Sequence, residues 1–460
     1  MKTTKLTFIT DLHYYSPSLG VNGEAYEIRS GSDQKCLAES GAIIDSAFEK
    51  IKNSDTDAVI ICGDITNNGE TVCHKEIKEK LIELQKSKPV YLITSTHDYC
   101  SNGLPNRYEG EKVIQNVEVM KESELRSFYY NFGPKQSSEE YINENGTSSY
   151  CVEIGSTAVL CLNDDHNGEG KSGFGKEHYD WIEKTVFKAK NEAKIVIAVE
   201  HHLAMPHVHP LVTVSGQMIA NNYSHCEKLA GLGIKLIITG HSHIQRTTRY
   251  VSPKGNTIYQ INAASLVGTP GTIVNITINE NEIEYEVTGT DCFEYNGETY
   301  NTTDYLNSHF ENMVDNLINS FIIKDKSQAQ KWLNAFGMGK INKYRNFIKP
   351  LAKAITRIKV GSLCRTVNIF TFGKAVDKTY IPKYKDESVY KIIKQILTEF
   401  FNGSKNSLSK EDDFYKLIMS VVSVPQKLFP KKVLFQSICE CVDNILTGGE
   451  FNHINGKIKL

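Results

Sequence analysis

The sequence predicts a layered α/β domain with mixed β-sheets, followed by an all-helical domain. Up to about residue 290, short and nearly all-apolar runs alternate with helical patterns, as expected for strands that helices cover on both faces. From about residue 303 the apolar residues recur at helical spacing instead. The chain has 460 residues, which is long enough for two domains. We therefore expect a first domain over residues 1–295 and a helical C-terminal domain over residues 300–460.

The strands of the first domain are predicted from apolar, β-branched runs. Those that read as buried on both faces are Lys5–Thr10, Ala58–Cys62, Val90–Thr94, Thr157–Leu162, Ile195–Val199 and Leu236–Thr239. A second group, which lies close together in sequence and is expected to be antiparallel, comprises Thr257–Asn262, Thr272–Ile278 and Ile283–Val287. In the second domain, Tyr305 to Phe321 and Val389 to Phe400 carry the helical period, and Asn402-Gly403 is a helix stop.

The composition is that of an ordinary globular protein, with 40% hydrophobic and 23% charged residues, which excludes a disordered or fibrous chain. No segment has the length and apolar character of a signal peptide or a membrane-spanning helix. Eleven scattered cysteines without a C-x-x-C pair favour free thiols in a reducing compartment. We therefore expect a cytoplasmic protein.

Acidic and imidazole side chains follow the predicted strands at the point where each strand ends. They are Asp11 and His13, Asp64, His97 and Asp98, His201 and His202, and His241 and His243. Because the carboxyl ends of parallel strands meet at one edge of a sheet, residues distant in sequence can converge there. Singly, each cluster has an ordinary structural explanation, such as a turn or a buried histidine pair. Together, in this order, they predict a metal site.

The ligand types restrict the metal. Mixed carboxylate and imidazole groups suit Mn, Fe, Zn or Ni, and no thiolate accompanies them. In an extended D-x-H segment, alternate residues point the same way, so Asp11 and His13 can hold one ion, and His241 and His243 have the same spacing. A carboxylate such as Asp64 can bridge two cations through its two oxygens.

These motifs resemble those of the calcineurin-like metallophosphoesterase superfamily, which run D-x-H, G-D-x-x, G-N-H-D, H and G-H-x-H. The resemblance covers about residues 4 to 290. It is greatest to bacterial members of the cyclic-nucleotide phosphodiesterase type with an appended helical domain, to which the Gly63–Glu70 and Tyr259–Pro270 segments are similar.

The resemblance implies a four-layer α-β-β-α sandwich with two metal ions. Asp11, His13, Asp64 and His243 would hold one ion, and Asp64, His201 and His241 the other. Asp64 would bridge the two ions. His97 would face the substrate phosphate and aid the leaving group, with Asp98 as its orienting partner or as a helix cap.

One departure from the family's pattern concerns the second ion. The family has Gly-Asn before the histidine of the third motif, whereas this chain has Ser95 and Thr96. Because the amide oxygen of Asn would be a ligand, the second site is expected to bind its ion more weakly. An alternative function follows from this departure, namely a degenerate member that binds a phosphate ligand or a protein partner without hydrolysing it.

The expected activity is metal-dependent hydrolysis of a phosphoester, as a phosphodiesterase or phosphatase, by a hydroxide held between the two ions that attacks phosphorus. The substrate is a small phosphoester or nucleotide. Selectivity is expected in the loops Tyr99 to Gly110 and His202 to Gly216.

A basic stretch marks the helical domain. From Lys326 to Val376 there are eleven Lys or Arg and no Asp or Glu, and between residues 340 and 360 they interleave with apolar residues at helical spacing. Such a helix can lie on an anionic membrane. We favour the interpretation that its apolar face packs on the domain core and its lysines face solvent. Pro350 is expected to interrupt the pattern. No nucleic-acid-binding motif accompanies the stretch.

Overall fold

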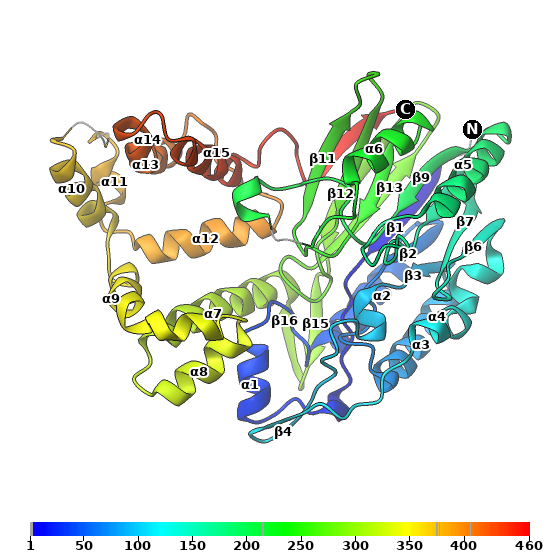
Figure 1. The fold of residues 1–460 in the computed structure, drawn as a ribbon, viewed down its shortest axis with the longest axis horizontal. Coiled ribbons are helices and arrows are strands. Elements are labelled where there is room, and N and C mark those ends of the chain that lie inside the picture. Colours follow the sequence, from blue (N-terminus) through cyan, green and yellow to red (C-terminus); the bar gives the residue numbers. More distant parts are fainter. Residues whose placement is uncertain (1–2, 214–215, 374–375, 377, 405) are drawn as a thin grey trace.

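The computed structural model describes residues 3–213, 216–373, 376, 378–404 and 406–460. Positions 214–215 of the predicted selectivity loop and 374–375 of the basic stretch lie outside the described residues. The predicted fold class is confirmed, since two mixed sheets stack face to face with helices on their outer sides and a helical region follows (Figure 1).

The predicted strands are present with nearly the predicted bounds, because each is an uninterrupted apolar or β-branched run. The strands are β1 (Thr4–Ile9), β2 (Ala58–Cys62), β3 (Val90–Ile93), β4 (Arg107–Glu109), β5 (Lys112–Ile114), β6 (Glu139–Ile142), β7 (Ser148–Ile154), β8 (Thr157–Cys161), β9 (Ile195–Val199), β10 (Leu236–Thr239), β11 (Arg246–Val251), β12 (Thr257–Asn262), β13 (Thr272–Ile278), β14 (Glu282–Gly289), β15 (Cys292–Tyr295), β16 (Glu298–Asn301) and β17 (Asn455–Lys459).

The two large sheets are each part parallel and part antiparallel. The first has the order β17-β14-β13-β1-β2-β3 and the second β11-β12-β10-β9-β8-β7-β6. In the first sheet β1, β2 and β3 run parallel, while β13 pairs antiparallel with β1. In the second sheet β8, β9, β10 and β12 run parallel. The carboxyl ends of the parallel strands therefore gather at one edge of each sheet.

The helices of the sandwich and of the helical region have the following bounds. They are α1 (Glu24–Ser30), α2 (Ser40–Lys52), α3 (Thr71–Gln85), α4 (Glu122–Phe128), α5 (Lys176–Asn191), α6 (Asn222–Gly231), α7 (Thr302–Ile322), α8 (Lys326–Ala335), α9 (Arg345–Ile355), α10 (Val360–Phe370), α11 (Ile381–Tyr384), α12 (Val389–Phe401), α13 (Asp413–Val422), α14 (Val424–Leu428) and α15 (Val433–Thr447). Short 3-10 helices are η1 (Pro17–Leu19), η2 (Thr96–Tyr99), η3 (Tyr130–Phe132), η4 (Pro134–Gln136), η5 (Pro210–Val212) and η6 (Gly339–Tyr344).

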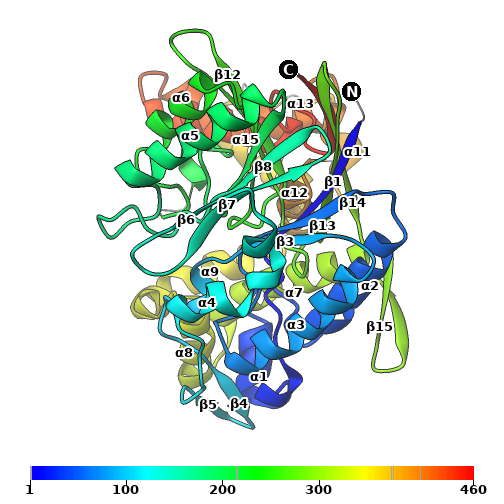
Figure 2. The same cartoon turned by 90° about the vertical axis from the view of Figure 1, so that its right-hand side faces the viewer.

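Both faces of the sheets are buried, which explains the apolar runs. In β2, Val59 and Ile61 pack toward α2 and α3, whereas Ile60 packs between the two sheets. Helices α5 and α6 cover the outer face of the second sheet, as Figure 2 shows on the side opposite to α2 and α3. This alternation of buried positions follows from the two-residue period of a strand.

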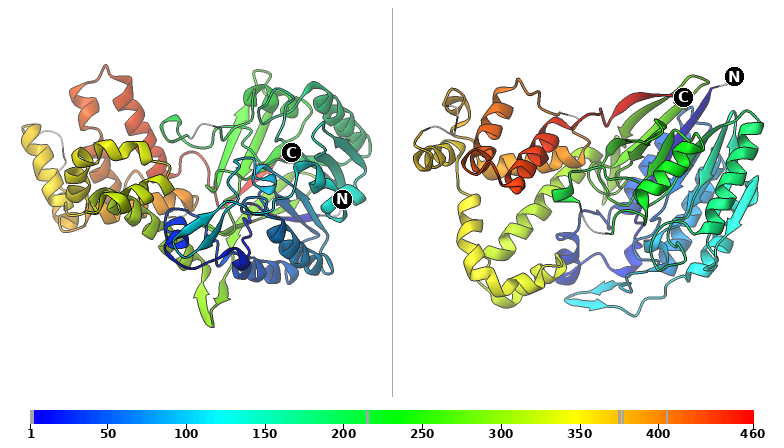
Figure 3. Two further views of the ribbon diagram at one scale, coloured as in Figure 1. Left: turned by 60° about the horizontal axis from the view of Figure 1, so that its bottom comes forward. Right: turned by 45° about the horizontal axis from the view of Figure 1, so that its top comes forward.

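The helical region extends to one side of the sandwich (Figures 1 and 3). The predicted helices over Tyr305–Phe321 and Val389–Phe400 correspond to α7 and α12, and α12 ends at Phe401 with Asn402, part of the predicted stop, as its C-cap. The strands β4 to β7, β11 and β15 to β17 were not predicted. The strand β17 returns to the first sheet and pairs antiparallel with β14, so the C-terminal segment completes the edge of the sandwich.

The basic stretch forms η6 and α9. Helix α9 continues through Pro350, so the predicted interruption there is wrong, and one main-chain hydrogen bond is lost instead. The predicted packing of its apolar face is only partly right. Ile348 and Ala352 pack on the core of the helical region, but Phe347 is 87% and Leu351 62% exposed.

Within the described residues, no helix combines the length and the apolar character needed to cross a bilayer. All eleven cysteines are free thiols, and ten of them are buried.

Candidate metal centre

Seven predicted site residues follow the carboxyl ends of strands from both sheets. They are Asp11 and His13 after β1, Asp64 after β2, His97 after β3, His201 after β9, and His241 and His243 after β10. The structure brings them together in overlapping groups whose donor atoms lie within 4.8 Å of one another. The convergence follows from the stacking of two sheets whose parallel strands end at the same place.

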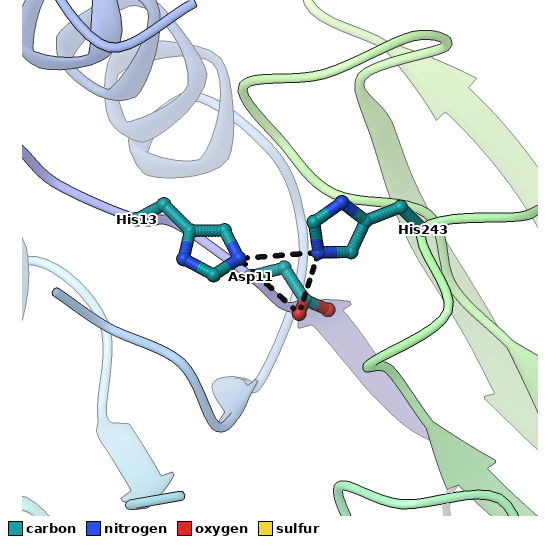
Figure 4. A group of neighbouring side chains, drawn as sticks. All are labelled: Asp11, His13 and His243. Atoms are coloured by element: carbon teal, nitrogen blue, oxygen red, sulfur yellow. Dashed lines mark hydrogen bonds and ion pairs between the residues drawn. The ribbon is translucent and has the colours of Figure 1, made fainter. Parts of the chain in front are cut away.

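One half of the site consists of Asp11, His13 and His243 (Figure 4). The Nε2 atoms of His13 and His243 are 3.1 Å apart, and Asp11 Oδ1 lies 3.1 Å from the Nε2 of His243 and 3.6 Å from that of His13. An ion with tetrahedral bonds of about 2.1 Å separates its ligand atoms by roughly 3.4 Å. The three donor atoms therefore already have the spacing of ligands around one ion.

The backbone reaches this arrangement through left-handed residues, not through extended D-x-H segments. The φ angles are 51° at Asp11, 38° at His13, 70° at His241 and 58° at His243, and 51° at Asp64. Residues other than glycine rarely adopt such angles, and they cluster at functional sites where the surrounding structure holds them. The prediction that D-x-H side chains converge is right, but the predicted extended conformation is wrong.

Two glycines make room for the site. Gly63 has φ +91°, and a Cβ there would lie 2.5 Å from His201 Nδ1. A Cβ at Gly240 would lie 2.5 Å from Asp11 Oδ2. Glycine is thus required at both positions by close approach, and at Gly63 also by its φ angle.

The other half of the site consists of Asp64, His201 and His241. His201 Nε2 lies 3.2 Å from Asp64 Oδ2 and 3.3 Å from His241 Nδ1. The two halves are joined at Asp64, whose Oδ2 is also 3.9 Å from His13 Nε2. A bridging position for Asp64 is therefore compatible with the geometry.

The imidazole tautomers indicate whether cations fit here. His243 Nδ1 donates to the Gln34 side-chain oxygen and His201 Nδ1 to the Cys62 carbonyl. Their Nε2 lone pairs consequently face the carboxylates of Asp11 and Asp64, an arrangement that is repulsive unless a cation or an extra proton lies between. A hydrogen bond from the other ring nitrogen to a carbonyl or amide oxygen is typical of metal-binding histidines. The donor set fits two divalent ions.

Charge differs between the halves. Burial alone would raise the pKa of the Asp11 carboxyl, but His243 and His13 hold it well below its usual range. Burial and the Lys35 ammonium lower the pKa of His13 to about 3. Burial would likewise lower the pKa of His201, but the Asp64 carboxylate raises it well above its usual range. The Asp64 carboxylate therefore favours the protonated form of His201.

His97 lies at the edge of both halves. Its ring is perpendicular to that of His13, with 4.8 Å between centroids. Its Nδ1 donates to the Asn67 carbonyl and to Asn68 Oδ1, the latter at 3.0 Å, which leaves Nε2 directed away from these partners.

Asp98 has the capping role and does not orient His97. Its carboxylate accepts from the backbone N–H groups of Ser95 and Thr66, each at 2.9 Å. The first contact caps η2. A short helix that starts immediately after a strand needs such a cap.

A third buried group was missed by the sequence analysis. Asp164, Asp165 and His202 form another set that could hold a metal. Asp164 accepts from both the backbone N–H and the Nδ1 of His202, at 2.7 and 3.0 Å. The two aspartates follow β8, so the rule used for the other strand ends would have found them. The ring of His202 also lies 4.4 Å from that of His241.

Lys35 was also missed, because no motif marks it. It is 7% exposed, and its Nζ lies 3.6 Å from the Asp33 carboxylate. Burial lowers the pKa of His97, and the charge of Lys35 lowers it further. The same charge lowers the pKa of His13. Lys35 is therefore a buried cation whose charge acts on both histidines.

Comparison with known proteins identifies a family whose profile matches the chain. The profile of the calcineurin-like phosphoesterases matches residues 4–245. No curated protein sequence matches the chain.

Solved structures that match the chain have low sequence identity to it. A dimetal phosphatase from Danio rerio has 12% identity and a TM-score of 0.45 over 65% of this chain and 98% of its own. A purple acid phosphatase from yellow lupin has 13% identity and a TM-score of 0.39 over 65% of this chain and 53% of its own. The NAD nucleotidase of Haemophilus influenzae has 11% identity and a TM-score of 0.34 over 78% of this chain and 62% of its own.

Proposed function

Because the chain belongs to the calcineurin-like phosphoesterase family, it is a phosphoric ester hydrolase, and we propose that it hydrolyses small phosphoesters with two divalent metal ions. The observation that supports this most is the convergence of six carboxylate and imidazole side chains on one site. Asp11, His13 and His243 would hold one ion, His201 and His241 the other, and Asp64 both. When bound, such ions supply Lewis acidity to phosphate oxygens and lower the pKa of water.

The chain's own residues position the substrate and move a proton. Lys35 offers a buried ammonium to the phosphate oxygens, where it neutralises charge without solvent screening. His97 keeps its Nδ1 proton on the Asn67 carbonyl, so Nε2 is the atom that would carry the second proton of the imidazolium form and deliver it to the departing alkoxide. Gln34 holds the ring of His243, and the Cys62 carbonyl holds that of His201.

Metal analysis together with an activity assay tests the proposal. The purified chain is loaded separately with Mn, Fe, Zn or Ni, its metal content is measured by plasma mass spectrometry, and hydrolysis of bis-p-nitrophenyl phosphate and p-nitrophenyl phosphate is followed. We expect two ions per chain and metal-dependent hydrolysis of one ester or both.

A second candidate function is motivated by Thr96, which replaces the amide ligand of the family's third motif. In that case the chain would bind a phosphate ligand or a protein partner without turnover. One ion per chain or none, with no hydrolysis under any of the four metals, would support the binder and contradict the enzyme.

We also propose that α9 makes a peripheral contact with anionic membranes. The exposed Phe347 and Leu351 lie among Lys343, Lys349 and Lys353, a combination of apolar and basic side chains that binds anionic lipid surfaces. Sedimentation with vesicles of phosphatidylglycerol and phosphatidylcholine tests this contact. Phe347→Ser should weaken the binding, whereas Phe187→Ser, at a 55% exposed residue of α5, should not. Absence of binding at low salt would exclude the contact.

A further inference from the structure

A cavity of about 620 Å³ opens beside His97. It is enclosed by α1, by the loop that follows η2, by the β4–β5 hairpin and by α8. Part of its wall thus comes from the loop Tyr99 to Gly110, in which selectivity is predicted. Another part comes from the helical region, through Lys331, Asn334 and Ala335 of α8. The cavity is far larger than a phosphate group needs.

The helical region also holds the segment that carries Lys35 and Gln34 into the metal centre. His309 of α7 donates through Nε2 to the Asp33 carbonyl at 2.9 Å. Asn316 of the same helix donates to the Gly31 carbonyl at 3.0 Å. The two contacts tie α7 to the loop between α1 and α2. The position of the helical region therefore affects both the cavity and the loop that carries Gln34 and Lys35.

The charged residues of the cavity neutralise one another. Lys331 pairs with Glu24 at 2.8 Å, and Arg29 forms an ion pair with Asp33. Glu111 lines the cavity as well. Because no cationic side chain that lines it among the described residues lacks an acidic partner, the cavity does not favour a second phosphate or another anion.

The remaining lining combines amides with exposed apolar side chains. Asn102, Asn334 and Gln115 present donors and acceptors, and such amides recognise the heteroatom edges of ring systems. Leu104 and Val113 are 48% and 52% exposed and can pack against the face of a ring. This combination suits a ligand with a flat apolar face and a hydrogen-bonding edge.

A chain of hydrogen bonds connects the lining to His97. Asn68 Oδ1 accepts from His97 Nδ1 at 3.0 Å and from Asn102 Nδ2 at 3.2 Å. The histidine that delivers the proton and an amide of the cavity wall are therefore positioned by one side chain. A group bound in the cavity would lie on the leaving-group side of the phosphate.

We propose that this cavity binds the alcohol part of the substrate, and that this part is an uncharged alcohol bearing a flat, hydrogen-bonding ring, of about the size of a nucleoside. The inference rests on the proposed function. In the reaction, water adds to phosphorus and gives up a proton, and the bond from phosphorus to the alcohol oxygen breaks. The alcohol leaves the cavity with a proton delivered by His97, and the proton given up by the water replaces it. Helix α8 thereby contributes to substrate selection.

Calorimetric titration of the full-length, metal-loaded chain with adenosine tests the proposal without requiring turnover. We expect saturable binding to the wild type. Ala335→Trp should reduce the affinity at least tenfold, because the larger side chain fills the cavity from α8. The matched control is Ala354→Trp, at an exposed alanine of α9 that does not line the cavity, and it should bind like the wild type.

If the Ala335→Trp chain does not fold, as judged by circular dichroism, Asn334→Ala replaces it, with an expected loss of threefold or more. Absence of adenosine binding to the wild type, or equal binding to the cavity variant, would overturn the proposal. Hydrolysis of p-nitrophenyl esters is measured in parallel. An active chain that does not bind adenosine contradicts only the cavity's role, whereas a chain that binds adenosine but hydrolyses nothing contradicts the proposed function.

Discussion

The two halves of the candidate metal centre use the same residue types but differ in charge. In the half with Asp11, His13 and His243, burial and Lys35 keep His13 unprotonated, with a pKa of about 3. In the half with Asp64, His201 and His241, the Asp64 carboxylate raises the pKa of His201 well above its usual range. An ion must displace a proton in the second half but not at His13 in the first. The second half also has Thr96 where relatives have an amide ligand, so we expect its ion to bind more weakly.

The largest effect is expected at the residue that the halves share. Asp64→Asn removes a charge from both, so both ions should be lost and hydrolysis of bis-p-nitrophenyl phosphate should fall by about 10²–10³-fold or more, the loss typical of one preorganised charge-stabilising group. Metal content and kcat/KM are measured together. A folded variant that keeps two ions and normal turnover would contradict the shared role.

A substitution at Gly63 should damage the second half selectively. Gly63→Ala places a Cβ 2.5 Å from His201 Nδ1 at a φ of +91°. We expect loss of the second ion and destabilisation by about 3 kcal/mol, since both a clash and backbone strain are introduced.

The matched control is Gly255→Ala, where φ is +83° but no atom lies within 4 Å of the added Cβ. This variant should lower the free energy of unfolding by only about 1 kcal/mol, because only the backbone strain of a positive φ angle is introduced. Thermal unfolding and metal content distinguish the two variants. Equal destabilisation, with both ions retained, would show that the contact with His201 is unimportant.

The pH dependence of metal binding should also differ between the halves. The raised pKa of His201 means that this group is protonated at neutral pH in the metal-free protein, so binding releases a proton. The affinity of the second ion should therefore increase with pH, by up to about tenfold per pH unit, as long as His201 in the metal-free protein still carries the proton that the ion displaces. His13, with its pKa of about 3, requires no such displacement. Stepwise calorimetric titration with Mn or Zn measures both constants, and parallel pH profiles would refute the assignment of the proton to His201.

The smallest effect is expected from restoring the missing amide. Thr96→Asn should strengthen binding of the second ion by about three- to tenfold, which corresponds to about 0.7–1.4 kcal/mol, and should leave the first ion unaffected. Thr96→Val, which has no hydroxyl and no amide, serves as the control. If Asn and Val give the same second-ion affinity, the amide is not a ligand in this chain.

The sequence alone determined the fold class, the convergence of the motifs and those strands that are uninterrupted apolar or β-branched runs. Doubly buried strands such as β2 and β9 are uninterrupted apolar runs, so their bounds follow from hydrophobicity and local propensity. The ligands could be predicted because each follows directly after such a run. Their binding of metal stays a prediction, as does the division of the chain near residue 300.

Only the tertiary structure decided how these residues meet. The left-handed backbone at Asp11 and His243, the proton on His201 and the buried charge of Lys35 arise from contacts between segments far apart in the chain. The return of β17 to the first sheet and the wall that α8 adds to the cavity beside His97 have the same origin. Hydrophobic periodicity reports which face of an element is buried, but it does not report against which partner, and the differences between the two halves of the metal centre depend on that partner.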